Sequence, residues 1–224
     1  MTGGKIFAIV IVIIVALIVL GSTFYTLNES EQAIVTQFGK PIGGAITDAG
    51  LHVKIPFIQA LHRFEKRILI WDGSADQIPT ADKKYIWLDT TARWKIEDPL
   101  LFYQSVGNVS GAWSRLDDII DSAARDVVSS HILIEVVRNS NQIIEKERAG
   151  REKTESIDIV LEEIELGREK LTEEILARAV EMMPQYGINM LDVQIKRLNY
   201  IEDVRKKVYE RMISERQRIA SKYR

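Results

Sequence analysis

Few residues of this chain have the types and spacing that catalysis or metal binding requires. The three histidines, His52, His62 and His131, do not pair at a metal-ligand spacing such as H-x-x-x-H. A structural, hydrogen-bonded role is therefore the favoured interpretation for each of them. The sequence contains no cysteine, which excludes thiol catalysis, disulfide bonds and cysteine-ligated metals.

The remaining candidates for chemistry are weak. Residues 107–111 read GNVSG, which does not match the G-x-S-x-G nucleophile elbow, and neither glycine pattern for nucleotide binding occurs. Asp117, Asp118 and Asp121 fall on the polar side of a predicted helix, where a solvated surface is the ordinary interpretation and a cation site the alternative. We therefore expect no catalytic residue, no metal and no cofactor. A membrane-tethered hydrolase stays as an alternative that would need a reactive serine or a metal site.

The charge balance argues against nucleic-acid binding. The formal net charge of the 224 residues is −2. Acidic residues predominate over positions 145–181 and basic residues over positions 196–224. Such segregation is often a solvated helix surface, but it can also direct pairing between neighbouring subunits.

The N-terminal segment has the composition of a membrane span. Residues 6–20 read IFAIVIVIIVALIVL, and positions 21–25 add no charge. A spanning helix needs about 20 mostly apolar residues. We predict a transmembrane helix over residues 5–25, with a tail at 1–4. The alternatives are a cleaved signal peptide, although VLGSTFY is a poor cleavage site, and a buried core helix. The predicted anchor residues are Ile6, Ile9, Ile13, Leu17, Leu20 and Phe24.

The flanking charges predict the orientation of this span. Lys5 precedes it, whereas Glu29 and Glu31 follow it and the next basic residue is Lys40. Because basic flanks stay in the cytoplasm, the N-terminus should be cytoplasmic and the main domain extracytoplasmic.

A period of two marks several strands over residues 26–98, a membrane-proximal subdomain. Residues 31–39 alternate and end in a turn, residues 51–56 form a short strand stopped by Pro56, and residues 64–71 form another. Residues 85–96 give the clearest strand, with Ile86, Leu88, Ala92, Trp94 and Ile96 on one face and Tyr85 and Trp87 on the other. The short gaps predict an antiparallel sheet. An apolar edge near the bilayer, or equally core packing, is predicted for Leu51, Val53, Ile55, Pro56, Phe57 and Ile58.

Helical spacing takes over in a second α/β subdomain, residues 99–200. Asp98 and Pro99 predict a helix start, and that helix closes near Gly107. A helix of about five turns follows, with Leu116, Ile119, Ile120, Ala123, Val127 and Val128 in one stripe. Thr172 is predicted to cap a later helix with the face Ile175, Leu176, Ala179, Val180 and Met183, ended by Pro184 and Gly187. A strand with Leu191, Val193 and Ile195 on one face follows. Residues 141–168 receive no assignment.

The last segment, residues 201–224, predicts a basic, coiled-coil-like helix. Its broken apolar seam predicts contact between subunits. The seam consists of Val204, Val208, Met212, Ile219 and Tyr223, and the first four are the predicted oligomer contacts. The fold class is therefore α+β: a transmembrane helix, a small antiparallel sheet domain with packed helices, and an extended C-terminal helix.

Three blocks, in this order, resemble one family. EQAIVTQFGK, GLHVKIPF and YGINMLDVQIK are together similar to the stomatin/prohibitin/flotillin (SPFH, or band 7) proteins, and within them to the HflC type. The resemblance covers nearly the whole chain. It departs from the family pattern at NQIIEKERAGREKTESIDIVLEEIELGREKL.

The resemblance implies a scaffold rather than an enzyme. It implies a single-pass protein of the bacterial inner membrane with a periplasmic main domain. Its implied partners are membrane lipid, an HflK-like paralogous subunit and an FtsH-type AAA protease, which a large hetero-oligomeric ring or cage would enclose and modulate. The alternative within the family is a stomatin/prohibitin-like homo-oligomer that organises membrane microdomains.

Overall fold

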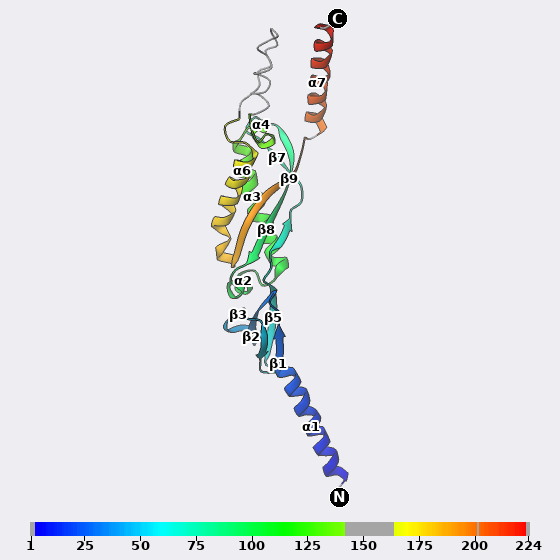
Figure 1. Ribbon diagram of the computed structural model, residues 1–224, viewed down its shortest axis with the longest axis vertical. Helices are drawn as coiled ribbons and strands as arrows, with labels where there is room; N and C mark the ends of the chain where they lie inside the picture. The colour runs from blue at the N-terminus through cyan, green and yellow to red at the C-terminus, as the bar shows by residue number, and fades with distance from the viewer. Residues whose placement is uncertain (1–2, 142–163, 201, 223–224) are drawn as a thin grey trace. The chain divides into compact units, whose positions relative to one another are not determined.

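The computed structural model describes residues 3–141, 164–200 and 202–222 (Figure 1). It divides the chain into two compact units. Unit 1 comprises Met1–Leu69, Trp94–Gly111 and Met183–Asn189, and unit 2 comprises Ile70–Arg93, Ala112–Met182 and Met190–Arg224. In the part of the chain that is described, no helix is both long enough and apolar enough to cross a membrane.

Unit 1 starts with a helix that leads directly into strands. Helix α1 (Gly3–Thr23) is followed by β1 (Phe24–Leu27), β2 (Glu31–Gln37), β3 (Lys40–Ile46), β4 (Gly50–Val53) and β5 (Gln59–Glu65). β1 pairs with β4, and the order in the second sheet is β3-β2-β5, all antiparallel. β2 is the central strand and is buried on both faces, which is why Ala33, Ile34 and Val35 stand in sequence without polar interruption.

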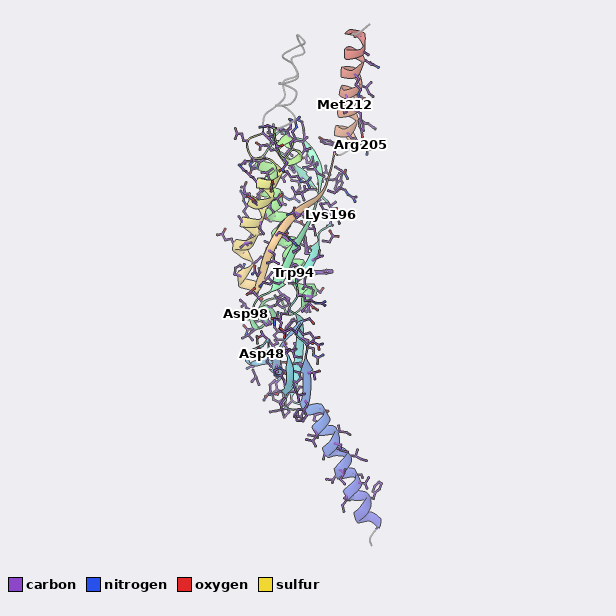
Figure 2. All side chains as sticks on the ribbon, viewed as in Figure 1. Asp48, Trp94, Asp98, Lys196, Arg205 and Met212 are labelled. Atoms are coloured by element: carbon purple, nitrogen blue, oxygen red, sulfur yellow. The ribbon has the colours of Figure 1, made fainter. Side chains whose placement is uncertain are left out.

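Aromatic packing forms the core of unit 1. The ring of Phe102 meets the edge of Phe64 at 5.4 Å between centroids and stacks on Trp94 at 6.3 Å. Phe102 lies on α2 (Pro99–Ser105), and Asp98 caps this helix by accepting hydrogen bonds from the Leu100 and Leu101 amides at 2.9 and 3.0 Å (Figure 2). The predicted helix start at Asp98 and Pro99 is confirmed.

Unit 2 is built on a four-stranded sheet. The strands of this sheet are β6 (Leu69–Asp72), β7 (Asp76–Pro79), β8 (Tyr85–Ile96) and β9 (Ile188–Tyr200), and β8 pairs with the other three. Most residues of each strand belong to unit 2, whereas Leu69, Trp94–Ile96 and the first two residues of β9 belong to unit 1. Helices α3 (Val109–Ser130), α4 (Leu133–Val137) and α6 (Arg168–Met182), the short 3-10 turn η1 (Pro184–Tyr186) and helix α7 (Glu202–Lys222) complete the described elements. Antiparallel sheets with several helices confirm the predicted α+β class.

The two clearest patterns of the sequence are confirmed. In β8 the predicted inner residues and Thr90 are buried, while Tyr85 and Trp87 are exposed. In α3 the predicted stripe is buried throughout. Both elements have one apolar and one polar face, so burial follows the period of the element.

The prediction of one strand over residues 64–71 is wrong. β5 ends at Glu65 and β6 begins at Leu69. Three exposed residues separate the strands, and the first of them is held elsewhere, because the Lys66 amide donates to the Ser30 carbonyl at 2.8 Å. The side chain of Lys66 also pairs with Glu29 at 3.2 Å.

Thr172 does not cap a helix. α6 begins at Arg168, four residues before Thr172. Gly167, immediately before the helix, has a φ of 83°, which glycine adopts readily. The first turn is capped from elsewhere in the chain, because the Asn139 side-chain oxygen accepts from the Glu169 amide at 3.1 Å. Thr172 lies inside the helix and donates to the Arg168 carbonyl at 2.8 Å. The buried face of α6 is therefore Leu171, Thr172, Ile175 and Ala179, and Leu176 and Val180 lie outside it.

The predicted face of Leu191 is wrong. Ile188 and Met190 are buried, and so are Val193 and Ile195, so the inward period slips by one residue between the two pairs. At this slip the Asp192 carboxylate accepts from the Arg93 amide at 3.2 Å and from the Arg93 guanidinium at 2.9 Å. The hydrogen bond from the Arg93 side chain lowers the pKa of Asp192 below its ordinary value. Leu191 is left exposed.

Candidate functional site

The histidines take part in structural hydrogen bonding. His52 Nε2 lies 2.8 Å from the Asp48 carbonyl, and His131 Nδ1 lies 2.8 Å from the Val127 carbonyl. His62 Nε2 lies 3.1 Å from the Thr36 hydroxyl. Among the described residues no group of three acidic or histidine side chains is placed to hold a metal ion. The exposed surfaces of the described residues are the next candidates for function.

The acidic cluster of α3 is held by its own neighbours. Asp117 accepts from the Trp71 indole N–H at 2.6 Å, and Asp76 pairs with Arg125. Burial, and then the charges of Asp117 and Asp76, raise the pKa of Asp121 to about 6. Asp121 is therefore the member of this cluster whose carboxylate takes up a proton at higher pH than an ordinary aspartate.

The β1–β4 ribbon exposes an apolar face next to the end of α1. In the register of the two strands Phe24 lies opposite Val53 and Thr26 opposite Leu51. Because directly opposite residues share a face, these four side chains point the same way, and all four are exposed. Tyr25 and Leu27 point the other way and are buried.

The loop between β4 and β5 extends this face. The Ile55 amide donates to the Gln59 side-chain oxygen at 2.7 Å, and the Gln59 amide donates to the Ile55 carbonyl at 3.0 Å. This closed loop presents Phe57 with 83% of its surface exposed and a φ of 65°. A positive φ is unusual for a bulky residue, so the backbone is strained where the ring is most exposed.

Phe38 also combines a positive φ with high exposure. It was not among the residues predicted from the sequence. It occupies the two-residue β2–β3 loop with a φ of 48°, is followed by Gly39 at 79°, and is 84% exposed. Gln37 lies opposite Gln59, so Phe38 lies at the end of the sheet from which the β4–β5 loop emerges. A single apolar residue in a turn has no periodic signal. One signal could have indicated it: Phe precedes Gly at a position where two-residue hairpin turns favour Asn.

We call these side chains the apolar ledge of unit 1. The predicted alternative of core packing does not describe them, because every member is exposed. The ledge consists of Phe24, Phe38, Leu51, Val53, Ile55, Phe57 and Ile58. Pro56 lies between two of its members and is half-buried.

The predicted anchor residues of α1 are equally exposed. Ile9, Ile13, Leu17 and Leu20 present most of their surface outside the chain, and Phe24 belongs to the ledge. The side chain of Ile6 lies outside the described residues. The described stretch from Phe7 to Leu20 therefore offers apolar side chains on all sides.

The predicted seam of α7 is described only in part. The side chains of Val204, Val208 and Ile219 lie outside the described residues. Met212 (Figure 2) is exposed, and so are Tyr209 and Ile213 of the same helix. A surface hollow of about 770 Å³ is lined by Met212 and Tyr209 of α7 together with Trp87, Leu198, Asn199, Tyr200 and Arg205.

Comparison with known proteins gives consistent matches. The model of the SPFH domain / Band 7 family matches residues 25–224. Protein HflC of Treponema pallidum (strain Nichols) is 37% identical over 230 residues, covering 96% of this chain and 68% of that protein. Protein HflC of Borreliella burgdorferi is 36% identical, covering 98% of this chain and 69% of that protein. The modulator of FtsH protease HflC of Escherichia coli (strain K12) is 27% identical, covering 97% and 71%.

Proposed function

Since this chain belongs to the SPFH domain / Band 7 family, we propose that it is a non-catalytic membrane scaffold subunit that modulates an FtsH-type AAA protease. The name of the Escherichia coli relative, modulator of FtsH protease, supports the choice of partner. The three histidines are engaged in structural contacts, which supports a role through surfaces rather than catalysis.

The observation that carries this proposal is the continuity of exposed apolar surface from α1 to the apolar ledge. Exposed apolar side chains need a partner, and a bilayer can cover both a helix and an adjacent edge. α1 has 21 residues, which at 1.5 Å per residue is about the thickness of the hydrocarbon core. The structure describes side chains of α1 only from Phe7 onward. The proposed span also includes Ile6 before this stretch and Phe24 after the helix, both of which are uncharged.

The proposed topology is single-pass in the bacterial inner membrane, with the main domain in the periplasm. Lys5 in the first turn of α1, before the apolar run, and the acidic Glu29 and Glu31 after the helix support this orientation. A reporter that is active only in the periplasm, fused after Arg224, should be active. Activity of a cytoplasm-specific reporter at the same site would reverse the orientation, and a mature N-terminus near Ser22 would remove the anchor.

We propose further that α7 joins neighbouring subunits in a ring or cage shared with an HflK-like paralogue. An apolar stripe on a helix needs a partner surface, and Tyr209, Met212 and Ile213 are exposed within this chain. The basic excess of residues 196–224 favours an acidic surface on the neighbour. The hollow beside Met212 provides room for an apolar side chain of that neighbour.

Affinity purification of the tagged full chain from gently solubilised bacterial membranes tests the function. We expect an FtsH-type protease and an HflK-like chain in the same large complex. A large homo-oligomer without either partner would favour the stomatin/prohibitin-like organiser instead. The matched control is a chain whose ledge carries Phe57→Ser, which should keep the protein partners if they bind through other surfaces.

A further inference from the structure

Charge in unit 1 is sorted along its β strands. Residues 24–69 contain four acidic side chains, Glu29, Glu31, Asp48 and Glu65. Glu31 lies opposite Glu65 at the end of the β2–β5 pair remote from Phe38. Asp48 lies in the β3–β4 connection (Figure 2), two residues before Gly50, which pairs with Leu27 at the end of β1 remote from α1. The end that carries the ledge therefore has no acidic residue of this segment.

Basic side chains occur at both ends but differ in their partners. At the acidic end Lys66 pairs with Glu29 at 3.2 Å and Arg67 pairs with Glu65. At the ledge end, Lys40 follows the Phe38–Gly39 turn and Lys54 precedes the Phe57 loop. Within the described residues neither Lys40 nor Lys54 forms an ion pair.

The backbone places these two lysines beside the ledge. The Lys54 amide donates to the carbonyl of Thr23, the last residue of α1, at 2.8 Å. Lys40 pairs with Gln37, which pairs with Gln59 at the end of the Phe57 loop. Each lysine is thus within two or three residues of one of the two phenylalanines at positive φ. Two lysines that form no ion pair among the described residues are therefore attached to the backbone beside the loops that present the apolar ledge.

We propose that Lys40 and Lys54 bind the phosphate groups of anionic phospholipids in the leaflet that the ledge enters. This inference rests on the proposed membrane contact of the ledge and adds the class of lipid. An ammonium group on a long aliphatic stem can reach the headgroup level while its stem stays against apolar surface. Charge complementarity selects an anionic headgroup over a zwitterionic one, because no neighbouring carboxylate of the segment neutralises the two lysines.

Selective quenching in nanodiscs tests this inference on the full chain. The sequence has no cysteine, so Ile42→Cys, an exposed site two residues from Lys40, gives one position for a bimane label. The discs contain phosphatidylcholine and phosphatidylglycerol at 7:3. Two preparations are compared, one with brominated phosphatidylglycerol and one with brominated phosphatidylcholine, at the same mole fraction of brominated lipid. One lysine near a charged surface changes local lipid preference by about fivefold. We therefore expect quenching at least twofold stronger when phosphatidylglycerol carries the bromine.

Two variants separate the site from overall charge. Lys40→Gln with Lys54→Gln should bring the quenching ratio to one, whereas Lys66→Gln, at the acidic end, should leave it unchanged. Equal quenching by both lipids in the unmodified chain would overturn the anionic preference and leave the membrane contact standing. Absence of quenching by either lipid would overturn the membrane contact itself. Loss of the preference in Lys66→Gln would show that net charge, not these two lysines, is responsible.

Discussion

The backbone amide of Lys54 donates a hydrogen bond to the carbonyl oxygen of Thr23, with 2.8 Å between the two atoms. This bond links the last residue of α1 to the loop that carries Ile55, Phe57 and Ile58. Because it involves main-chain atoms, substitutions of the exposed side chains should leave the position of the loop unchanged. The proposed membrane contact can therefore be tested through side chains without moving the loop relative to the end of the helix.

Replacement of Phe38 should affect stability and lipid contact in opposite directions. Phe38→Asn places Asn before Gly39 in a two-residue hairpin loop where both residues have positive φ, the combination that such turns prefer. We expect a gain of about 1 kcal/mol in unfolding free energy, because a bulky residue in the left-handed region is strained.

Urea unfolding in detergent measures the first effect, and lipid quenching measures the second, which should fall. Phe64→Asn is the matched control, because Phe64 is buried against Phe102 and its loss should destabilise unit 1 strongly. If Phe38→Asn destabilises the fold as Phe64→Asn does, Phe38 has a packing role and does not belong to the ledge.

Trp94 and Trp87 should respond differently to the same substitution. Trp94 is fully buried and stacks on Phe102, whereas Trp87 is 43% exposed on the opposite face of β8. An unpaired buried carboxylate costs several kcal/mol, so Trp94→Asp should prevent folding of unit 1. Trp87→Asp should cost about 1 kcal/mol or less. Limited proteolysis and thermal unfolding compare the two, and equal effects would contradict the assignment of the faces.

The acidic surface of α3 predicts a specific dependence of stability on pH. The folded pKa of Asp121 is raised to about 6, above the ordinary value of 3.8. A raised folded pKa stabilises the fold at low pH, and this contribution is lost as pH rises through about 6. Asp121→Asn should therefore stabilise the protein at pH 7.5 by about 1 kcal/mol, allowing for solvent screening, and change little near pH 4.

Denaturant unfolding at the two pH values measures this difference. Asp126→Asn is the control, because Asp126 is an exposed carboxylate of the same helix and is not among the charges that raise the pKa of Asp121. A gain for Asp121→Asn that is the same at both pH values would show that packing, not ionisation, is responsible.

Glutamate on the seam of α7 should dissociate the proposed assembly. Val204→Glu with Val208→Glu introduces charge into the predicted stripe, and Met212→Glu does so at an exposed described residue. We expect the large complex to fall apart on size-exclusion chromatography while the anchored subunit keeps its circular dichroism. Gln217→Glu, also exposed on α7, adds the same single charge as Met212→Glu and serves as its control. An intact complex in the seam variants, or an unfolded subunit, would remove the intersubunit role.

Regular amphipathic elements could be predicted from the sequence, and irregular positions could not. The alternation of β8 and the stripe of α3 are repeated over many residues, so single exceptions do not hide them. The start of α6 could not be predicted, because Asn139, which is remote in sequence, supplies the cap that Thr172 is expected to provide. The face of Leu191 could not be predicted, because the burial pattern of β9 shifts by one residue where Asp192 binds Arg93.

The residues of the candidate site also differ in whether the sequence could predict them. The apolar run around Leu51, Val53 and Ile55 could be noted from the sequence, but alternation alone does not say whether such a face is covered. Exposure distinguishes the ledge from core. Phe38 needed the β2–β5 register, which no local pattern contains, to be placed beside the loop of Phe57.

Depth-dependent quenching of single labelled cysteines tests most directly the claim that the apolar ledge lies in the membrane. Labels at position 57 and at position 48, in nanodiscs with bromine at defined acyl-chain depths, compare the ledge with the acidic end of the same unit. We predict strong quenching at position 57, greatest for shallow bromines, and none above the aqueous background at position 48. Equal, weak quenching at the two positions would contradict the account.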